Sequence, residues 1–445
     1  MRRTINLKKG LNLNLEGGIT DVKHAEVVEA SRVAIVPDDY PGFRAKAEVV
    51  EGDIVAAGAP LLRHKDDPDV KLVSPIGGKV EAVVRGPRRK IERVVVNASA
   101  EAPAPLKFSV GSTPESLKEA LKLSGLWAMM RQRPYDIVPL DGTAPRDIFV
   151  TALDTAPLAI SPEHAVNGHM SDVAAGVKAL GMLTAGHIYI GVAKGSVLPD
   201  IEGAEIVEFP HLHPAGNAGV QAANIAPVNK GEVIWTLDIV TLAKIGKLVS
   251  TGETDPKVTV AVTGSEVLTP MVVETLVGAE LKDILRDNLK EDGHHHRIIS
   301  GNVLTGEPSQ LDGFLRYPYR QVTVIPEGDD ADEFMGWASL SPNKMSESRS
   351  FIGKLLGKKF NPDARLNGGR RAMIMSEIYD RYLPMDILPE YLIKAIEAKD
   401  IDQMENLGIY EVAPEDFALA EYADPSKLEL QKIVREGLDY LRSEV

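Results

Sequence analysis

Two histidines lie close together in the segment Phe209–Gly219, which reads FPHLHPAGNAG. Imidazole nitrogens bind metals and also hydrogen-bond to ligand oxygens. If the chain from Pro210 is extended, His211 and His213 share one face and form half of a metal site. No Glu-x-x-His helix accompanies them, which favours a role in shaping a pocket or an interface. His211, His213 and Asn217 are therefore candidates for ligand contact, and the sequence predicts no catalytic residue and no metal site.

Other ligands for metals and redox centres are scarce. The run His294–His296 follows Glu291-Asp292-Gly293, which is typical of a surface loop and predicts adventitious metal binding only. The chain contains no cysteine. Its absence excludes disulfides, thiolate nucleophiles and cysteine-ligated iron–sulfur clusters, and it disfavours structural zinc.

The N-terminal part of the chain contains two half-motifs of a biotin- or lipoyl-carrier domain. Gly52–Gly58 reads GDIVAAG, and Leu72–Val84 reads LVSPIGGKVEAVV. A carrier holds its cofactor on a lysine in the hairpin between these motifs. Lys65 and Lys71 are the only candidates, and neither stands at the usual spacing. The pattern predicts a barrel-sandwich domain with unmodified lysines, in which glycines occupy turns of positive φ.

Patterns for nucleotide binding are absent. No Gly-x-Gly-x-x-Gly occurs in the sequence, although the strand–helix rhythm of the middle region would suit a dinucleotide site. Gly353–Lys359 has only three residues between its first glycine and the Gly-Lys pair, and no Ser or Thr follows. A phosphate-binding loop needs four residues there, so we reject this segment.

The elements that position these residues change in type along the chain. Short apolar runs separated by Gly, Pro and Asp turns predict β-structure in residues 1–100. A helix follows, with Thr113 as N-cap, Pro114 in the first turn and its end near Gly125.

Residues 125–255 alternate strands and helices. Asp147–Ala152 and His187–Val192 are predicted strands, and Asp172–Leu180 is a predicted helix between them. This alternation predicts a parallel sheet that helices cover on both faces.

The pattern of apolar residues predicts a small α+β unit in residues 256–328. Beyond residue 335 the chain is rich in charged residues and is predicted to be helical. The predicted elements are strands at Lys257–Val262 and Gln321–Pro326, a helix at Leu281–Leu289 and an amphipathic helix at Lys427–Ser443.

Length and charge narrow the functional classes. The 445 residues suggest about three domains, and a net charge of -14 disfavours nucleic acid as the main partner. The most apolar segment, Val233–Val249, is interrupted by Asp238, Lys244 and Lys247, so no run of about 18 apolar residues spans a membrane. The N-terminus lacks the apolar core of a signal peptide. We therefore expect a cytoplasmic protein.

Several short motifs, taken in their order along nearly the whole chain, resemble a known family. It comprises the A subunits of sodium-translocating NADH:quinone reductases, a bacterial membrane respiratory complex. Each motif is weak alone, and their order makes the resemblance specific. They are Lys8–Leu11, Ser74–Gly78, Ile148–Ala159, His213–Gly216, Ile245–Leu248, Gly301–Gly306, Asn367–Gly369 and Leu383–Pro389.

The resemblance implies a multidomain α/β and α+β fold with four parts. These are a barrel-sandwich hybrid domain in residues 1–105, a Rossmann-like domain similar to the flavin subunit of complex I in 106–255, a β-grasp module of the SLBB type in 256–330, and a helical C-terminal domain in 331–445.

The resemblance also implies a function. The chain would be a peripheral subunit on the cytoplasmic side of the bacterial inner membrane, in a translocase that reduces quinone with NADH electrons and pumps Na⁺. Its partners would be the other subunits of that complex, with a contribution to quinone binding or assembly. NADH, flavins and iron–sulfur centres would reside in the partners, because this chain would bind no cofactor and would be inactive alone.

Two differences from related redox proteins support the expectation that this chain binds no cofactor. The connection that corresponds to the glycine-rich FMN loop of the complex I subunit, Arg133–Gly142, has one glycine. The segment Glu421–Lys427 stands where the related C subunit of the Rnf complex carries Cys-x-x-Cys runs, and it has no cysteine. Two other classes stay open: a free-standing flavin- or nucleotide-binding oxidoreductase with an atypical loop, and a true biotin or lipoyl carrier.

Overall fold

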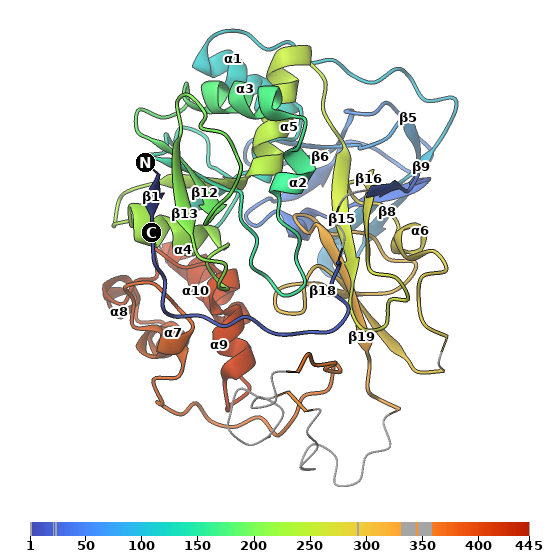
Figure 1. Ribbon diagram of the computed structural model, residues 1–445. Helices are drawn as coiled ribbons and strands as arrows, with labels where there is room; N and C mark the ends of the chain where they lie inside the picture. The colour runs from blue at the N-terminus through green and yellow to red at the C-terminus, as the bar shows by residue number, and fades with distance from the viewer. Residues whose placement is uncertain are drawn as a thin grey trace.

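The computed structural model describes residues 2–20, 22, 25–291, 293–330, 344–345 and 358–444 (Figure 1). Within these ranges the strands form two sheets of 6 strands, one of 4 and one of 3. Gly353–Gly357, which belongs to the rejected phosphate-loop segment, and Asp292 lie outside the described residues.

Two small antiparallel sheets form the barrel-sandwich part. Gly52 and Gly58 take φ values of 96° and 84° in its turns, as predicted. Val33, Val80 and Val94 are buried in its core, because branched side chains pack well on a pleated surface. One sheet has the order β3 (Arg32–Ile35), β9 (Ile91–Ala98), β8 (Gly78–Arg85), β5 (Ile54–Val55), and the other has β4 (Ala45–Ala47), β6 (Pro60–His64), β7 (Lys71–Val73). Two short 3-10 helices are η1 (Pro37–Asp39) and η2 (Pro87–Arg89).

A 6-stranded sheet forms the α/β part, and the strands predicted at 147–152 and 187–192 are confirmed in it. Its spatial order is β1 (Arg3–Thr4), β13 (Glu205–Phe209), β12 (Ile188–Ala193), β11 (Ile148–Thr151), β14 (Ile234–Asp238), β10 (Arg131–Arg133). All neighbours are parallel except β14 and β10. The chain runs outward from β11 to β13 and then returns to the other side of β11, so the winding direction reverses between β11 and β14.

Helices cover both faces of this sheet, as predicted (Figure 1). On one face α3 and α5 approach so closely that a Cβ on Gly246 would lie 1.7 Å from the carbonyl oxygen of Asp172. On the other face Phe149, Phe209 and Ala222 share a core beneath α4. These helices are α3 (Met170–Leu180), α4 (Ala218–Ile225) and α5 (Ile239–Thr251), and the short α2 (Glu163–Val166) precedes α3.

The helix α1 (Pro114–Leu123) joins the barrel-sandwich part to the α/β part. It begins as predicted, because the Thr113 hydroxyl accepts a hydrogen bond from the Ser116 amide at 3.2 Å. Leu117 and Leu121 are completely buried on its inner face. The 3-10 helix η3 (Trp127–Met129) follows.

The second 6-stranded sheet forms the β-grasp part. Val258, Val260 and Val262 point into its core at period two, as predicted. The predicted helix at 281–289 ends early, because the chain leaves helical geometry at Arg286. The order is β18 (Glu307–Ser309), β17 (His296–Ser300), β19 (Gln321–Pro326), β15 (Lys257–Thr263), β16 (Met271–Leu276), β2 (Ala25–Val27), with α6 (Leu281–Leu285) packed on the sheet.

The described residues from 358 to 444 form a helical part with its own apolar core. The amphipathic helix predicted at its end is confirmed, with Leu430, Val434, Leu438 and Leu441 on the buried face. The elements are η6 (Tyr379–Arg381), α7 (Pro389–Ala398), α8 (Ile401–Asn406), η7 (Pro414–Phe417), α9 (Ala418–Ala423) and α10 (Leu430–Glu444).

The N-terminal strap, residues 5–20, runs across the molecule from β1 towards β2 (dark blue in Figure 1). The Leu11 amide donates to the His213 carbonyl, the Glu16 amide to the Phe360 carbonyl and the Gly264 amide to the Gly17 carbonyl, at 2.8 to 3.0 Å. The first residues thus supply the strands β1 and β2 to the α/β and β-grasp sheets. The prediction of one N-terminal domain over residues 1–105 did not include these two strand pairings.

Candidate functional site

The three candidate ligand-contact residues lie in different surroundings. The chain bends at His211, which is exposed, whereas His213 is 4% exposed. The two imidazoles do not share a face, so the extended geometry considered for half a metal site is wrong. Asn217 lies at the start of α4, and its amide donates to the Glu415 carbonyl oxygen at 3.1 Å in the helical part.

His213 is enclosed by its own loop and the strap. Its Nδ1 lies 3.2 Å from the Thr155 hydroxyl, which also accepts from the Gly216 amide at 2.9 Å. The His213 amide donates to the Asn12 side chain at 2.8 Å. Burial lowers the pKa of His213 to about 4, so the ring is neutral at pH 7. These contacts give His213 a role in fixing the loop to the strap.

The connection Arg133–Gly142, which corresponds by resemblance to a flavin loop, is held by the helical part. The Arg133 guanidinium is 1% exposed and donates to Asp416 Oδ2 at 3.2 Å. Arg435 of α10 donates to the carbonyl oxygen of Asp136 at 3.0 Å. Two arginines of the chain itself therefore anchor this connection against the helical part.

The hairpin between β6 and β7, where a carrier lysine would lie, is docked on α1. Asp67 near its tip pairs with Lys122 at 2.7 Å, and Lys122 is 8% exposed. Lys71 pairs with Glu48 at 2.7 Å, whereas Lys65 is exposed. A carrier arm must swing freely, so a tip fixed by a largely buried ion pair favours unmodified lysines.

We expect the intact mass of the purified protein to equal that of the unmodified chain, because the hairpin tip is docked and lacks a lysine at carrier spacing. Mass spectrometry of protein co-expressed with biotin and lipoate ligases gives the measurement. Lys65→Arg and Lys71→Arg variants are matched controls. A mass increment of biotin or lipoate that disappears in one of these variants would identify a carrier instead.

The carboxyl ends of β11 and β14 form the crevice in which parallel α/β sheets commonly bind ligands. Asp238 ends β14 and accepts from the Thr241 amide at 2.6 Å, which caps α5. Its other carboxylate oxygen pairs with Arg320 at 3.1 Å. Gln321 donates to the Pro157 carbonyl oxygen at 3.1 Å, in the loop after β11. Side chains at the start of β19 therefore reach over the strand ends.

Aromatic and basic side chains join three parts of the fold at one point, the junction. Tyr40 of the barrel-sandwich part stacks on Tyr317 of the β-grasp part, with ring centroids 4.9 Å apart and planes 4° from parallel. Arg131 of β10 lies over the Tyr317 ring, 5.6 Å from its centroid. The Tyr317 hydroxyl donates to the Met129 carbonyl oxygen at 2.7 Å.

Two pockets flank the junction and share Met129 and Val277. The first junction pocket has a cavity volume of about 50 Å³ and largely apolar walls: Ile35, Tyr40, Leu72, Val73, Ser74, Pro75, Ser124, Gly125, Leu126, Thr254, Asp255 and Pro256. The second has a cavity volume of about 30 Å³ and more charged walls: Asp238, Val240, Thr241, Lys244, Val258, Gly278, Leu315, Arg316, Tyr317, Pro318, Tyr319 and Arg320. An apolar cavity beside a polar one suits an amphiphilic ligand.

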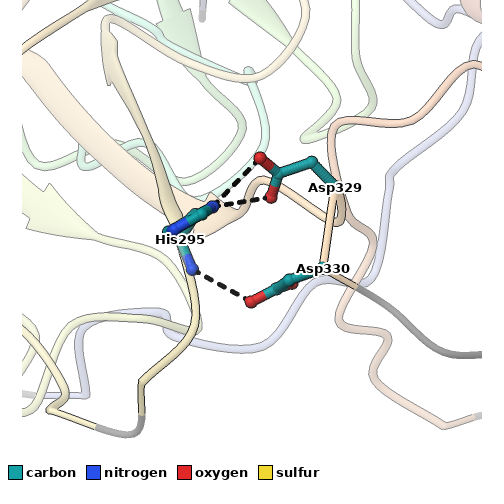
Figure 2. A group of neighbouring side chains, drawn as sticks. All are labelled: His295, Asp329 and Asp330. Atoms are coloured by element: carbon teal, nitrogen blue, oxygen red, sulfur yellow. Dashed lines mark hydrogen bonds and ion pairs between the residues drawn. The ribbon is translucent and has the colours of Figure 1, made fainter.

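His294 and His295 of the histidine run lie on the surface, as predicted, beside two aspartates, whereas His296 is partly buried at the start of β17 (Figure 2). His295 Nδ1 lies 3.0 Å from both carboxylate oxygens of Asp329, and the His295 amide donates to Asp330 at 3.3 Å. The Asp329 carboxylate raises the pKa of His295 through its hydrogen bond. The three ligand atoms lie within 4.8 Å of one another but are exposed and bonded to each other, so we assign them no metal.

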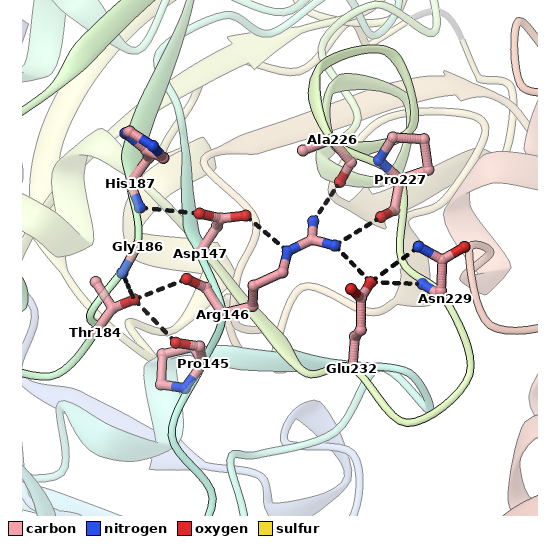
Figure 3. A network of polar contacts seen from close by, with 10 residues as sticks. All are labelled: Pro145, Arg146, Asp147, Thr184, Gly186, His187, Ala226, Pro227, Asn229 and Glu232. Carbon is pink, nitrogen blue, oxygen red and sulfur yellow. Dashed lines mark hydrogen bonds and ion pairs between the residues drawn. The ribbon is translucent and has the colours of Figure 1, made fainter.

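A polar network joins the amino ends of β11 and β12 (Figure 3). Arg146 donates to Asp147 at 2.8 Å and pairs with Glu232. Asp147 also accepts from the His187 amide at 2.9 Å, and Thr184 donates to the Arg146 carbonyl oxygen at 2.9 Å. This edge is opposite the ligand crevice, so we interpret the network as structural support for the strand starts.

Sequence reasoning missed the junction, because its residues come from segments up to about 280 positions apart. One signal was present: Tyr317-Pro318-Tyr319-Arg320 places two aromatic rings and a guanidinium around one proline. Such a run is a candidate for ligand contact, although several of its side chains turn out to join the folded parts.

These parts define a protein class in which a barrel-sandwich, a parallel α/β sheet and a β-grasp sheet follow one another and meet at one junction. Three family models match the chain: the NqrA N-terminal barrel-sandwich hybrid domain at residues 5–99, the NqrA second alpha/beta domain at 112–254, and the SLBB model described as the NQRA C-terminal domain at 259–310. The chain belongs to the NqrA family, which comprises the A subunits of Na(+)-translocating NADH-quinone reductases.

Whole-chain relatives are named as the A subunits of the same reductase. The protein of Pasteurella multocida (strain Pm70) is 34% identical over 450 residues, and that of Histophilus somni (strain 2336) is 33% identical over 451. Each match covers 99% of this chain and 100% of the relative. Among solved structures, an NAD+-reducing [NiFe]-hydrogenase matches 74% of this chain and 61% of its own, at 11% identity and a TM-score of 0.38. That similarity is too low to bear on function.

Proposed function

We propose that this chain is a peripheral subunit on the cytoplasmic side of the bacterial inner membrane. It belongs to the translocase that reduces quinone with NADH electrons and pumps Na⁺ out of the cytoplasm, and the other subunits of that complex are its partners. The full-length match to relatives of that name supports membership. No helix in the described ranges has the length and apolarity to cross a bilayer, which supports attachment through partner subunits.

We infer that the chain binds no redox cofactor and that NADH, flavins and iron–sulfur centres reside in the partners. The strand order favours a Rossmann-like domain, and its proposed similarity to the flavin subunit of complex I comes from the family resemblance. The flavin-loop counterpart Arg133–Gly142 is held by Arg435 instead. Asp172 occupies the first turn of α3, where a carboxylate opposes phosphate binding. The sequence has no cysteine to hold a cluster.

We also propose that the chain contributes to quinone binding at the junction. The single observation behind this is the first junction pocket, which has apolar walls from three parts of the fold. Its serine hydroxyls already donate to backbone carbonyls, Ser74 to Ile76 at 2.7 Å and Ser124 to Leu121 at 3.2 Å. The pocket therefore suits the apolar tail of a quinone better than its ring oxygens.

We expect the purified chain to bind decylubiquinone without oxidising NADH or reducing quinone, because it has an apolar pocket but no redox centre. Isothermal titration calorimetry measures decylubiquinone binding. An absorbance spectrum detects any bound flavin, and an assay of NADH oxidation with quinone measures turnover. Leu126→Trp, which fills the pocket, should weaken binding about 10-fold. Stoichiometric flavin with NADH turnover would favour the free-standing oxidoreductase, and equal binding by the tryptophan variant would exclude this pocket.

A further inference from the structure

The hairpin that joins β8 to β9 ends in a dense group of basic side chains. Residues 85–93, which we call the basic tip, contain five cations and one carboxylate in a chain whose net charge is -14. All five cations are exposed, and within the described residues only Lys90 has an ion pair, to Asp38 at 2.7 Å. The five are Arg85, Arg88, Arg89, Lys90 and Arg93.

The backbone of the basic tip is strained at two of its arginines. The Lys90 amide donates to the Pro87 carbonyl oxygen at 3.2 Å, which closes a turn around Arg88 and Arg89. Both arginines have positive φ, 54° and 60°, in the region that Gly and Asn prefer. A hairpin turn with two such residues usually contains Asn-Gly. Strained residues cluster at functional sites, so two arginines at these positions indicate a role for their charge.

The base of the hairpin holds the basic tip in a fixed place. Val94 and Val96 of β9 are completely buried in the barrel-sandwich core, whereas Val95 shares a core with Phe314 of the β-grasp part. The centre of β9 is therefore buried on both faces of its sheet, while the basic tip is exposed. Its charges are presented by a supported hairpin and act together on one partner.

The sign of the charge distinguishes two kinds of partner at a membrane. Cytoplasmic loops of membrane proteins carry an excess of Lys and Arg, so they repel the basic tip. The cytoplasmic lipid surface is negative, because it contains anionic phospholipids, and it attracts the basic tip. The acidic remainder of the chain is repelled by the same surface. Charge complementarity therefore favours lipid headgroups and turns this hairpin towards the bilayer.

We propose that the basic tip contacts the phosphate groups of anionic phospholipids and orients the chain at the membrane surface. This inference rests on the proposed function, which places the chain on the cytoplasmic side of the membrane. Each basic side chain near an anionic surface strengthens binding about 5-fold. The basic tip alone therefore binds weakly and adds to attachment through the partner subunits. Arginine suits the contact, because its guanidinium donates two hydrogen bonds to one phosphate.

The test measures sedimentation of the purified full chain with phosphatidylcholine vesicles that contain or lack phosphatidylglycerol. We expect binding only to the anionic vesicles, and we expect its loss at about 0.5 M NaCl, because salt screens exposed charges. Arg88→Asn with Arg89→Gly removes two charges and supplies the residues that the turn favours. Its binding should be about 25-fold weaker, whereas its melting temperature should rise because the strain is relieved.

Two control variants separate the basic tip from net charge. Lys178→Gln with Lys194→Gln removes two exposed cations from the α/β part and should bind anionic vesicles like the parent. Arg88→Lys with Arg89→Lys keeps both charges and should bind nearly as well as the parent. Equal binding by the parent and by Arg88→Asn with Arg89→Gly would overturn the inference. Equal binding to neutral and anionic vesicles would overturn it too.

Separate measurements test this inference and the proposed function. If the parent does not bind anionic vesicles, the lipid contact is wrong, and recovery of the chain with the other subunits from membranes keeps the subunit role. If Arg88→Asn with Arg89→Gly binds vesicles like the parent but is lost from that complex, the basic tip contacts an acidic protein and the inference is wrong. If the parent itself is absent from the complex, the subunit role is wrong, and vesicle binding still decides the lipid contact.

Discussion

Replacing Asp416 by alanine is expected to loosen the helical part from the rest of the protein. The Asp416 side chain is fully buried and accepts from Arg133 at 3.2 Å and from the Ala413 amide at 2.9 Å. Removing one partner of a buried ion pair leaves an uncompensated charge, which typically destabilises a protein by about 3–5 kcal/mol. Asn217, which donates to the same carboxylate at 3.3 Å, loses a partner too.

Hydrogen exchange of α10 amides measures this effect locally, and we expect exchange at least about 100-fold faster in Asp416→Ala. The control is the double variant Arg133→Met with Asp416→Leu, which replaces the pair by apolar side chains and should recover most of the loss. Glu415 also pairs with Arg133, but its side chain is 45% exposed. The matched variant Glu415→Ala should therefore accelerate α10 exchange much less than Asp416→Ala does. Unchanged α10 exchange in Asp416→Ala would contradict this account.

Replacing Lys244 by methionine is expected to stabilise the α/β part. Burial lowers the pKa of Lys244 to about 8, from about 10.4 in an unfolded chain. At pH 7 the folded protein therefore carries an unfavourable buried charge, and its removal should raise the free energy of unfolding by about 2 kcal/mol after loss of the bond to Lys257. Urea unfolding followed by fluorescence of the buried Trp127 and Trp235 reports on this part.

The same lysine predicts a pH dependence. Between about pH 8 and pH 10 the unfolded chain binds more protons at this position than the folded chain, so stability of the parent rises with pH. Four charged neighbours also influence the pKa of Lys244 at pH 7 and at pH 10. Two carboxylates raise it, and two cations lower it: Asp255, Asp238, Arg320 and Lys247. The advantage of Lys244→Met should therefore shrink from pH 7 to pH 10. If Lys244→Met were less stable than the parent at pH 7, Lys244 would stabilise the folded protein and this prediction would be wrong.

Local patterns predicted the elements that carry their own signal. Thr113 and Pro114 define a helix start without help from the rest of the fold, and the valines of Lys257–Thr263 alternate at the strand period. The apolar segment Val233–Val249 shows the limit: the fold divides it into β14 and α5, and Asp238 between them is the N-cap.

The site was less predictable, because its geometry depends on tertiary contacts. His211 and His213 suggested a shared face, but the loop bends and buries only one of them. In the sequence Lys244 is only an interruption of an apolar run, whereas in the fold it is buried and donates to the carbonyl oxygen of Lys257 at the start of β15. The domain boundaries and the cofactor-free role stay predictions, and the strap, which places residues of the first 30 positions in two later sheets, had no local signal.

The strap has a consequence for biosynthesis. Leu15 bridges to Phe360, 345 positions later in the chain, so this contact of the strap forms only after most of the chain has been made. At about 5–20 residues per second this delay is roughly 20–70 s. The strands β1 and β2 pair sooner, because their partners β13 and β16 end at Phe209 and Leu276. The strap is therefore fixed in stages during translation, first through the strands at its two ends and last in its middle, at Leu15.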